Sequence, residues 1–264
     1  MTFTPPVFDL VTVYRFCVLF LRAASFMFTA PIIGSKNVPV TVKAGLSLAI
    51  AIVVYPVIPH QQLGQVPPNL PVFVLVVARE MIIGMAIGYI ARLVFDGVQF
   101  GAQYVAFMMG LGIANVLDPQ SEAQVPIIAQ MEGVIAFILF ISIGGHLWFV
   151  SAFHDSYAVL PTGGFQLISG TWALYIAKMV GRLFVIAMKV NAPIWAALLF
   201  TQVSMGIVAR MIPQINIFIV GFPLQIAVGF FVLAFSMSVL ATVLERYFYQ
   251  LYKEIFLMMR FMAG

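Results

Sequence analysis

Long apolar segments alternate along the chain with short clusters of proline, glycine and polar residues. A helix of roughly 20 apolar residues crosses the hydrocarbon core of a bilayer. The pattern predicts about six helical spans, within a range of five to seven, near residues 8–29, 40–58, 71–95, 127–153, 172–199 and 215–249. The third segment is open to continuation through residues 98–109, and Pro223 leaves the sixth open to a kink or a break. We therefore expect an all-α, polytopic membrane protein of long, partly broken helices.

The composition excludes the common classes of water-soluble protein. Hydrophobic residues make up 63% of the 264 positions, charged residues make up 8%, and the mean hydropathy is +1.08. A soluble domain has roughly 45–50% apolar and about 25% charged residues. A soluble enzyme, a disordered chain and a nucleic-acid-binding domain are therefore excluded. The 13 basic residues are scattered, which indicates contact with membrane lipid headgroups and no nucleic acid partner.

One stretch, residues 110–126, departs from the apolar pattern. It carries two glycines, two prolines and two acids between apolar segments. Backbone groups left unpaired in lipid cost several kcal/mol each, so this stretch does not face acyl chains. It either leaves the membrane as a solvent loop or lines a cavity enclosed by protein. Met108 and Met109 directly before it favour the cavity, because methionine packs adaptably against variable surfaces.

Several charged residues lie inside the apolar segments, where each needs a polar partner or water. Arg79 and Glu80 are adjacent and point about 100° apart on a helix, so each is expected to find its partner on another helix. Near them, the pairs Gly84/Gly88 and Gly97/Gly101 have the G-x-x-x-G spacing that lets helix backbones approach closely.

Lys178, Arg182 and Lys189 form one basic stripe, because they fall within about 40° of one another on a helix. The stripe fits either a hydrophilic conduit or ion pairing between helices or subunits, and pairing is favoured. The acids available for such pairing are Glu80, Asp96, Glu132 and Glu245.

The sequence contains no motif for catalysis or for a cofactor. It has no Walker A loop, no dinucleotide fingerprint and no G-x-S-x-G elbow. His146 and His154 lack the spacing of a zinc-binding helix, and the single cysteine, Cys17, excludes an internal disulfide. We therefore expect no metal, no cofactor and no enzymatic activity.

The most distinctive run of residues follows the fifth apolar segment. It consists of Arg210, Pro213, Gln214, Asn216, Gly221 and Pro223. This run resembles the FliR/SctT family of type III secretion export-gate proteins. Further matches in the same order lie at Arg22, Pro31, Gly34, Pro39, Arg79, Glu80, Gly84, Gly88, Asp118, Pro119, Gly145, His146, Ser156, Ala192 and Pro193. The resemblance covers roughly residues 10–250, and departs from many relatives at Gln225, where a lysine is expected.

The resemblance implies a channel subunit of the flagellar type III export gate, in the bacterial inner membrane at the flagellar basal body. Such a subunit assembles with FliP and FliQ, works with FlhA and FlhB, and passes unfolded flagellar subunits. The chain is then expected to form one membrane-embedded domain, residues 1–264. Its FliP-like part is expected at about residues 1–170, and a FliQ-like helical hairpin at about residues 171–264.

The resemblance also implies roles for two groups of residues. The segment that contains residues 110–126 is expected to project into the channel lumen and help close it. The candidate plug residues are Met108, Met109, Gly110, Gly112, Asn115, Asp118, Pro119 and Glu122. The candidates for buried or intersubunit ion pairs are Arg79, Glu80, Glu132, Lys178, Arg182 and Lys189.

Two other functions fit a polytopic membrane protein. A secondary transporter or ion channel would use a broken-helix site near residues 110–126. Such a protein usually has two related halves, which the sequence does not show. A polytopic membrane enzyme would need a catalytic site, and the sequence offers none.

Overall fold

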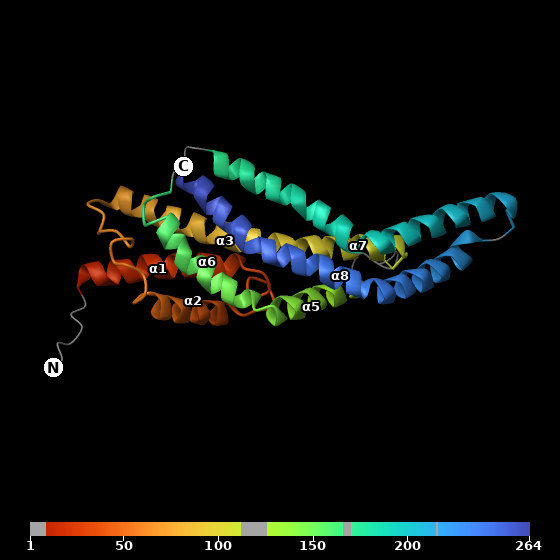
Figure 1. Cartoon of the computed structure of the whole chain (residues 1–264), viewed down its shortest axis with the longest axis horizontal. Helices are drawn as coiled ribbons and strands as arrows, with labels where there is room; N and C mark the ends of the chain where they lie inside the picture. Colours follow the sequence, from red (N-terminus) through yellow and green to blue (C-terminus); the bar gives the residue numbers. More distant parts are fainter. Residues whose placement is uncertain (1–8, 112–125, 166–169, 215) are drawn as a thin grey trace. The chain divides into compact units, whose positions relative to one another are not determined.

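The computed structural model describes residues 9–111, 126–165, 170–214 and 216–264. Within these ranges every regular element is an α-helix (Figure 1). The helices are α1 (Leu10–Thr29), α2 (Val40–Val54), α3 (Leu70–Met108), α5 (Ile127–Ser142), α6 (Gly145–Val159), α7 (Thr171–Met211) and α8 (Ile217–Ala263). The prediction of an all-α fold is confirmed for the described residues.

Prolines set the ends of the first two helices. Pro31 follows α1 and has no N–H to continue the helical hydrogen bonds. The carbonyl of Pro39 accepts the N–H groups of Val42 and Lys43, and so begins α2. α2 ends at Val54 and not near residue 58 as predicted, because Pro56 has no N–H to continue the helical hydrogen bonds, although Tyr55 before it still has helical geometry. Its 15 residues fall short of a bilayer span.

Three helices are much longer than a single bilayer crossing requires. α3, α7 and α8 contain 39, 41 and 47 residues. α3 continues from the third predicted segment through residues 98–109, one of the two alternatives that the sequence left open. α8 continues through Pro223 as one helix, so the proline does not divide it.

The fourth predicted span, residues 127–153, is divided into α5 and α6, which corrects the sequence prediction of one helix. The two helices are bent by 68° relative to each other. Gly144 lies at the bend with φ +74°, a left-handed conformation that interrupts a right-handed helix and that glycine adopts without steric cost.

The chain is a polytopic membrane protein. Among the described residues, α1, α3, α7 and α8 are long and apolar enough to cross a membrane. The bent pair of α5 and α6 brings the number to five if it forms one span. The difference from the predicted six is α2, which is too short.

The described helices belong to two compact units. The first contains residues up to Leu93, Gly144–Met179 and Gln250–Gly264, and the second contains Val94–Ile143 and Val180–Tyr249. α3, α7 and α8 contribute residues to both. In the first unit α1 packs along α2 (Figure 1). Its core includes Phe26, whose ring lies 5.8 Å from that of Phe149 and 6.3 Å from that of Phe153.

Candidate functional site

α3 ends in a glycine turn at the start of the central stretch. Gly110 has φ +81°. Its N–H donates to the carbonyl of Phe107 at 3.0 Å, and the N–H of Leu111 donates to the carbonyl of Ala106 at 3.0 Å. These two bonds make a Schellman motif, which ends a helix and satisfies two of its last carbonyls. The candidate plug residues Gly112, Asn115, Asp118, Pro119 and Glu122 lie outside the described residues.

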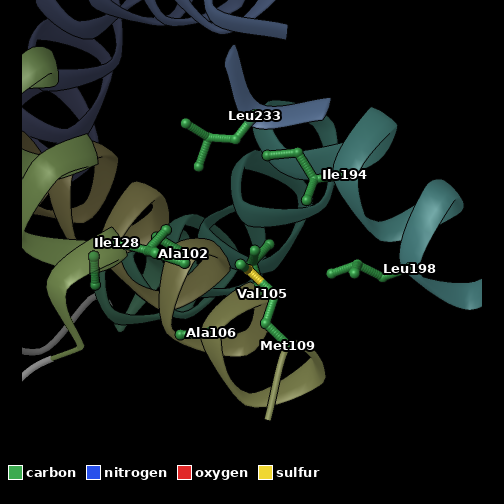
Figure 2. Packing of buried hydrophobic residues seen from close by; sticks show 9 residues of the cluster. Ala102, Val105, Ala106, Met109, Ile128, Ile194, Leu198 and Leu233 are labelled. Atoms are coloured by element: carbon green, nitrogen blue, oxygen red, sulfur yellow. The ribbon is translucent and has the colours of Figure 1, made fainter. Parts of the chain in front are cut away.

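The side chain of Met109 holds this turn in an apolar cluster, which we call the root cluster. The root cluster combines buried residues of α3, α5, α7 and α8, namely Ala102, Val105, Ala106, Met109, Ile128, Ala129, Ile194, Leu198 and Leu233 (Figure 2). A β-carbon added to Gly229 on α8 would lie 2.6 Å from the sulfur of Met109. The missing side chain at Gly229 therefore makes room for Met109.

Two further contacts hold the same turn from outside α3. The side-chain amide of Gln202 on α7 donates to the carbonyl of Met108 at 3.3 Å. The ring of Phe222 on α8 lies where a β-carbon on Gly110 would project. Leu111 packs against the root cluster and Ile128 is part of it, so the described residues on both sides of the central stretch meet at one place.

The first unit contains a buried ion pair between Arg22 on α1 and Glu80 on α3. Nε of Arg22 donates to Oε2 of Glu80 at 2.6 Å, and both side chains have no exposed surface. The guanidinium also donates to the hydroxyl of Ser156 and to the carbonyl of Leu160, each at 3.0 Å. It lies 3.7 Å from the ring centre of Tyr157. The expectation that Glu80 has its partner on another helix is confirmed.

Arg79, by contrast, contacts a connector. One of its terminal nitrogens donates to the carbonyl of Gly163, between α6 and α7, at 3.1 Å. The prediction of a partner on another helix is therefore wrong for this contact. Gly163 lies in the turn that precedes α7, and its carbonyl accepts this bond.

The glycine pairs of α3 bring helix backbones together as predicted. A β-carbon on Gly88 would lie 2.8 Å from the carbonyl oxygen of Phe26 on α1. A β-carbon on Gly101 would lie 2.8 Å from the carbonyl oxygen of Ala187 on α7. Such distances are shorter than a side chain tolerates, so each contact depends on glycine.

Glu132 on α5 is fully buried in the second unit. Neither of its carboxyl oxygens has a hydrogen-bond partner among the described residues. The side chain of Asn191 on α7 interacts with it and is itself fully buried. The predicted ion pair for Glu132 is absent from the described part of the chain.

The basic stripe lies on the exposed side of α7. Lys178, Arg182 and Lys189 are all exposed in this chain, which contrasts with the burial of Glu80 and Glu132.

The distinctive run forms the connection between α7 and α8. Arg210 lies in the last turn of α7, and Pro213 and Gln214 form an exposed turn. The carbonyl of Asn216 accepts the N–H groups of Ile219 and Val220 at 3.1 Å and 3.4 Å, and so begins α8. Gly221, buried, and Pro223, exposed, lie in the first two turns of α8.

This run and the buried pairs lie inside a segment that matches a known family. The family model for bacterial export proteins, family 1, matches residues 13–251. The chain belongs to this family.

Individual members of the export family share about a third of their residues with the chain. The flagellar biosynthetic protein FliR of Bacillus subtilis is 33% identical over 242 residues, which are 88% of this chain and 90% of that protein. FliR of Escherichia coli is 31% identical over 233 residues, 88% of this chain and 87% of that protein. FliR of Aquifex aeolicus is 28% identical over 250 residues, 93% and 95% of the two chains.

Four partners in these contacts were not identified from the sequence of this export-family chain. They are Arg22 as the partner of Glu80, Tyr157 beneath the guanidinium, Asn191 beside Glu132, and Gln202 at the end of α3. Arg22 carried a usable signal, because an arginine in the middle of an apolar segment requires a partner. Asn191 and Gln202 carried none, since a lone amide on a helix has no spacing to interpret.

Proposed function

We propose that this export-family protein is a non-enzymatic channel subunit of the flagellar type III export gate. In this proposal it assembles with FliP and FliQ, and the assembly passes unfolded flagellar subunits across the bacterial inner membrane at the flagellar basal body. The observation that carries the proposal is the family match over residues 13–251. FlhA and FlhB are the proposed partners on the cytoplasmic side.

The exposed side chains of α7 favour contact with a partner protein over contact with lipid. Lys178, Arg182 and Lys189 are exposed on a largely apolar helix. A lysine or arginine at the centre of a bilayer costs about 2.5–3.5 kcal/mol, so three on one stripe disfavour an acyl environment. Acidic side chains of a partner subunit would pair with Lys178 and Lys189.

The same proposal assigns two parts to the chain. Residues up to about 170 would take the place of a FliP-like subunit, and residues from about 171 would form a FliQ-like helical hairpin. The hairpin corresponds to α7 and α8, which are joined by the short turn at Pro213 and Gln214.

We assign pore closure to residues 110–126. The root cluster supports this assignment, because it holds Met109 and Ile128 while the intervening segment is too polar for lipid. Glycine-rich backbone with methionine beside it adapts to chains of any sequence.

Deletion of residues 112–122 tests the closure. With FliP and FliQ co-expressed, the deletion should raise ion leak across the membrane. A Gly-Ser replacement of equal length is the matched variant, since it keeps the connection and removes the side chains. Both variants should leak if the native segment seals the pore. Unchanged conductance in a normally assembled deletion variant would contradict the closing role.

A further inference from the structure

A buried carboxyl group in the second unit has no hydrogen-bond partner among the described residues. The side chain of Glu132 has no exposed surface. Its two oxygens accept no hydrogen bond from any described residue. A buried ionised carboxylate without a partner is so costly that the group becomes neutral instead.

Asn191, whose side chain interacts with this carboxyl, also has an oxygen without a hydrogen-bond partner among the described residues. Asn191 is also fully buried, and its carbonyl oxygen has no hydrogen-bond partner among the described residues. Its amide nitrogen makes a contact of 3.5 Å to the carbonyl of Ala187, at the outer limit of a hydrogen bond. A β-carbon on Gly101 of α3 would lie 2.4 Å from this nitrogen, so the missing side chain at Gly101 makes room for the carboxamide.

No charge compensates Glu132 from the helices of its unit. The other ionisable side chains there are Asp96 and Tyr104 on α3, Arg182, Lys189 and Arg210 on α7, and Glu245, Arg246, Tyr247 and Tyr249 on α8. None of these described residues forms a hydrogen bond or an ion pair with Glu132. The environment of the carboxyl is therefore apolar except for one amide.

We propose that Glu132 is a proton-binding site, and that its carboxylic acid pairs with the carboxamide of Asn191. The acid O–H donates to the carbonyl oxygen of Asn191, and the amide N–H of Asn191 donates to the carbonyl oxygen of the acid. These two hydrogen bonds, one through the bound proton and one through the amide N–H, satisfy three oxygens that are otherwise unpaired. This pairing needs no charged partner.

The bound proton stabilises the packing of the root cluster, next to which the central stretch begins. Ile128 and Ala129 lie one helical turn before Glu132, and Ile194 lies one turn after Asn191. All three belong to the root cluster that holds Met109. Loss of the proton would place a negative charge next to this cluster, and hydration of that charge would separate α5 from α7. The occupancy of Glu132 therefore controls the packing at the root cluster.

Infrared spectroscopy of the purified full-length chain tests the proposal. At neutral pH the chain should show the C=O stretch of a buried, protonated carboxylic acid. Glu132→Gln should remove this band, whereas Glu245→Gln, the matched control on α8, should keep it. Asn191→Ala should shift the band, since the acid loses its partner. Absence of the band in the unmodified chain, or its persistence in Glu132→Gln, would overturn the proposal.

The pH dependence of thermal unfolding gives an independent readout. A carboxyl that is protonated when folded and ionised when unfolded makes the folded state bind more protons, so stability falls as pH rises. The unmodified chain should lose Tm between about pH 5 and pH 8, where an unfolded glutamate is ionised. Glu132→Gln keeps the shape and the hydrogen bonds, and should remove this component of the slope. An equal slope in both chains would contradict proton binding at Glu132.

Discussion

Arg22 has the largest side chain that the described residues bury completely. It is tolerated because its nitrogens find Glu80, Ser156 and the carbonyl of Leu160, and because Tyr157 covers its face. Arg22 lies on α1, and its acceptors lie on α3, on α6 and directly after α6, all distant from α1 in sequence. The pair therefore joins three segments of the first unit, and its loss would leave a charge or several donors unpaired in the core.

Substitution of Arg22 by methionine should destabilise the chain by about 3–5 kcal/mol, since it leaves the carboxylate of Glu80 buried and uncompensated. The measurement is thermal unfolding of the purified chain in detergent. Lys36→Met is the control, because Lys36 is exposed. The double variant Arg22→Met, Glu80→Met should recover part of the loss. Equal stability of Arg22→Met and Lys36→Met would contradict the role of the buried pair.

The need for these partners could be predicted from the sequence, but their identities could not. Arg79 and Glu80 are adjacent in an apolar segment, so each required a partner elsewhere. Glu80 found its partner 58 positions away in the chain. Arg79 found a carbonyl in a connector, which no side-chain pattern encodes. Spacing within one helix gives the direction of a side chain and not the element that it meets.

At the scale of the helices, the glycines of α3 decide which neighbours it accepts. Gly84 and Gly88 face α1, and Gly97 and Gly101 face α7. One helix thus serves two close contacts, one in each unit. The G-x-x-x-G spacing predicted the close approach, and the structure supplies the identity of the partner helices.

Replacement of Gly84 by alanine should destabilise the chain by about 1–3 kcal/mol, because the new methyl group would collide with backbone atoms of α1. Gly45→Ala on α2 is the matched control, since nothing lies within 4 Å of its added methyl group. The control should be neutral or slightly stabilising, as alanine favours helices. Thermal unfolding of both variants gives the comparison. A Gly84→Ala variant as stable as Gly45→Ala would show that α1 and α3 are not closely packed.

Replacement of Gly110 by alanine should destabilise the turn at Gly110 and Leu111, where the central stretch begins. Alanine at the positive φ of Gly110 costs roughly 1 kcal/mol of backbone strain, and its methyl group would also collide with the ring of Phe222. Gly170→Ala is the control, since Gly170 also has a positive φ but nothing within 4 Å. Amide hydrogen exchange around Leu111 should accelerate only in Gly110→Ala. Equal exchange in both variants would show that Phe222 does not hold the turn.

Helix ends were harder to predict than helix existence. Long apolar runs predicted α1, α3, α7 and α8, because length and composition suffice for such elements. The division of α5 from α6 depends on the φ angle of Gly144, and a glycine in an apolar run gives no sign of whether it bends the chain. The end of α2 before Pro56 could have been predicted, because a proline in the sequence indicates that a helix ends there.

At the scale of the whole molecule, the chain has exposed features that suit protein neighbours better than lipid. α7 presents three cations on one stripe, and a cation among acyl chains is costly. A subunit of a hetero-oligomeric channel would cover these surfaces with partner chains. A transporter that works alone would have to expose Lys178 and Lys189 to acyl chains or water.

Co-purification in gentle detergent with mass analysis tests this account most directly. The chain is expressed together with FliP and FliQ, extracted, and its mass is measured without dissociation. The account predicts a stable complex that contains all three proteins and no appreciable population of the single chain. Recovery of the chain as a folded, stable monomer in the presence of both partners would contradict the export-gate assignment and favour a transporter.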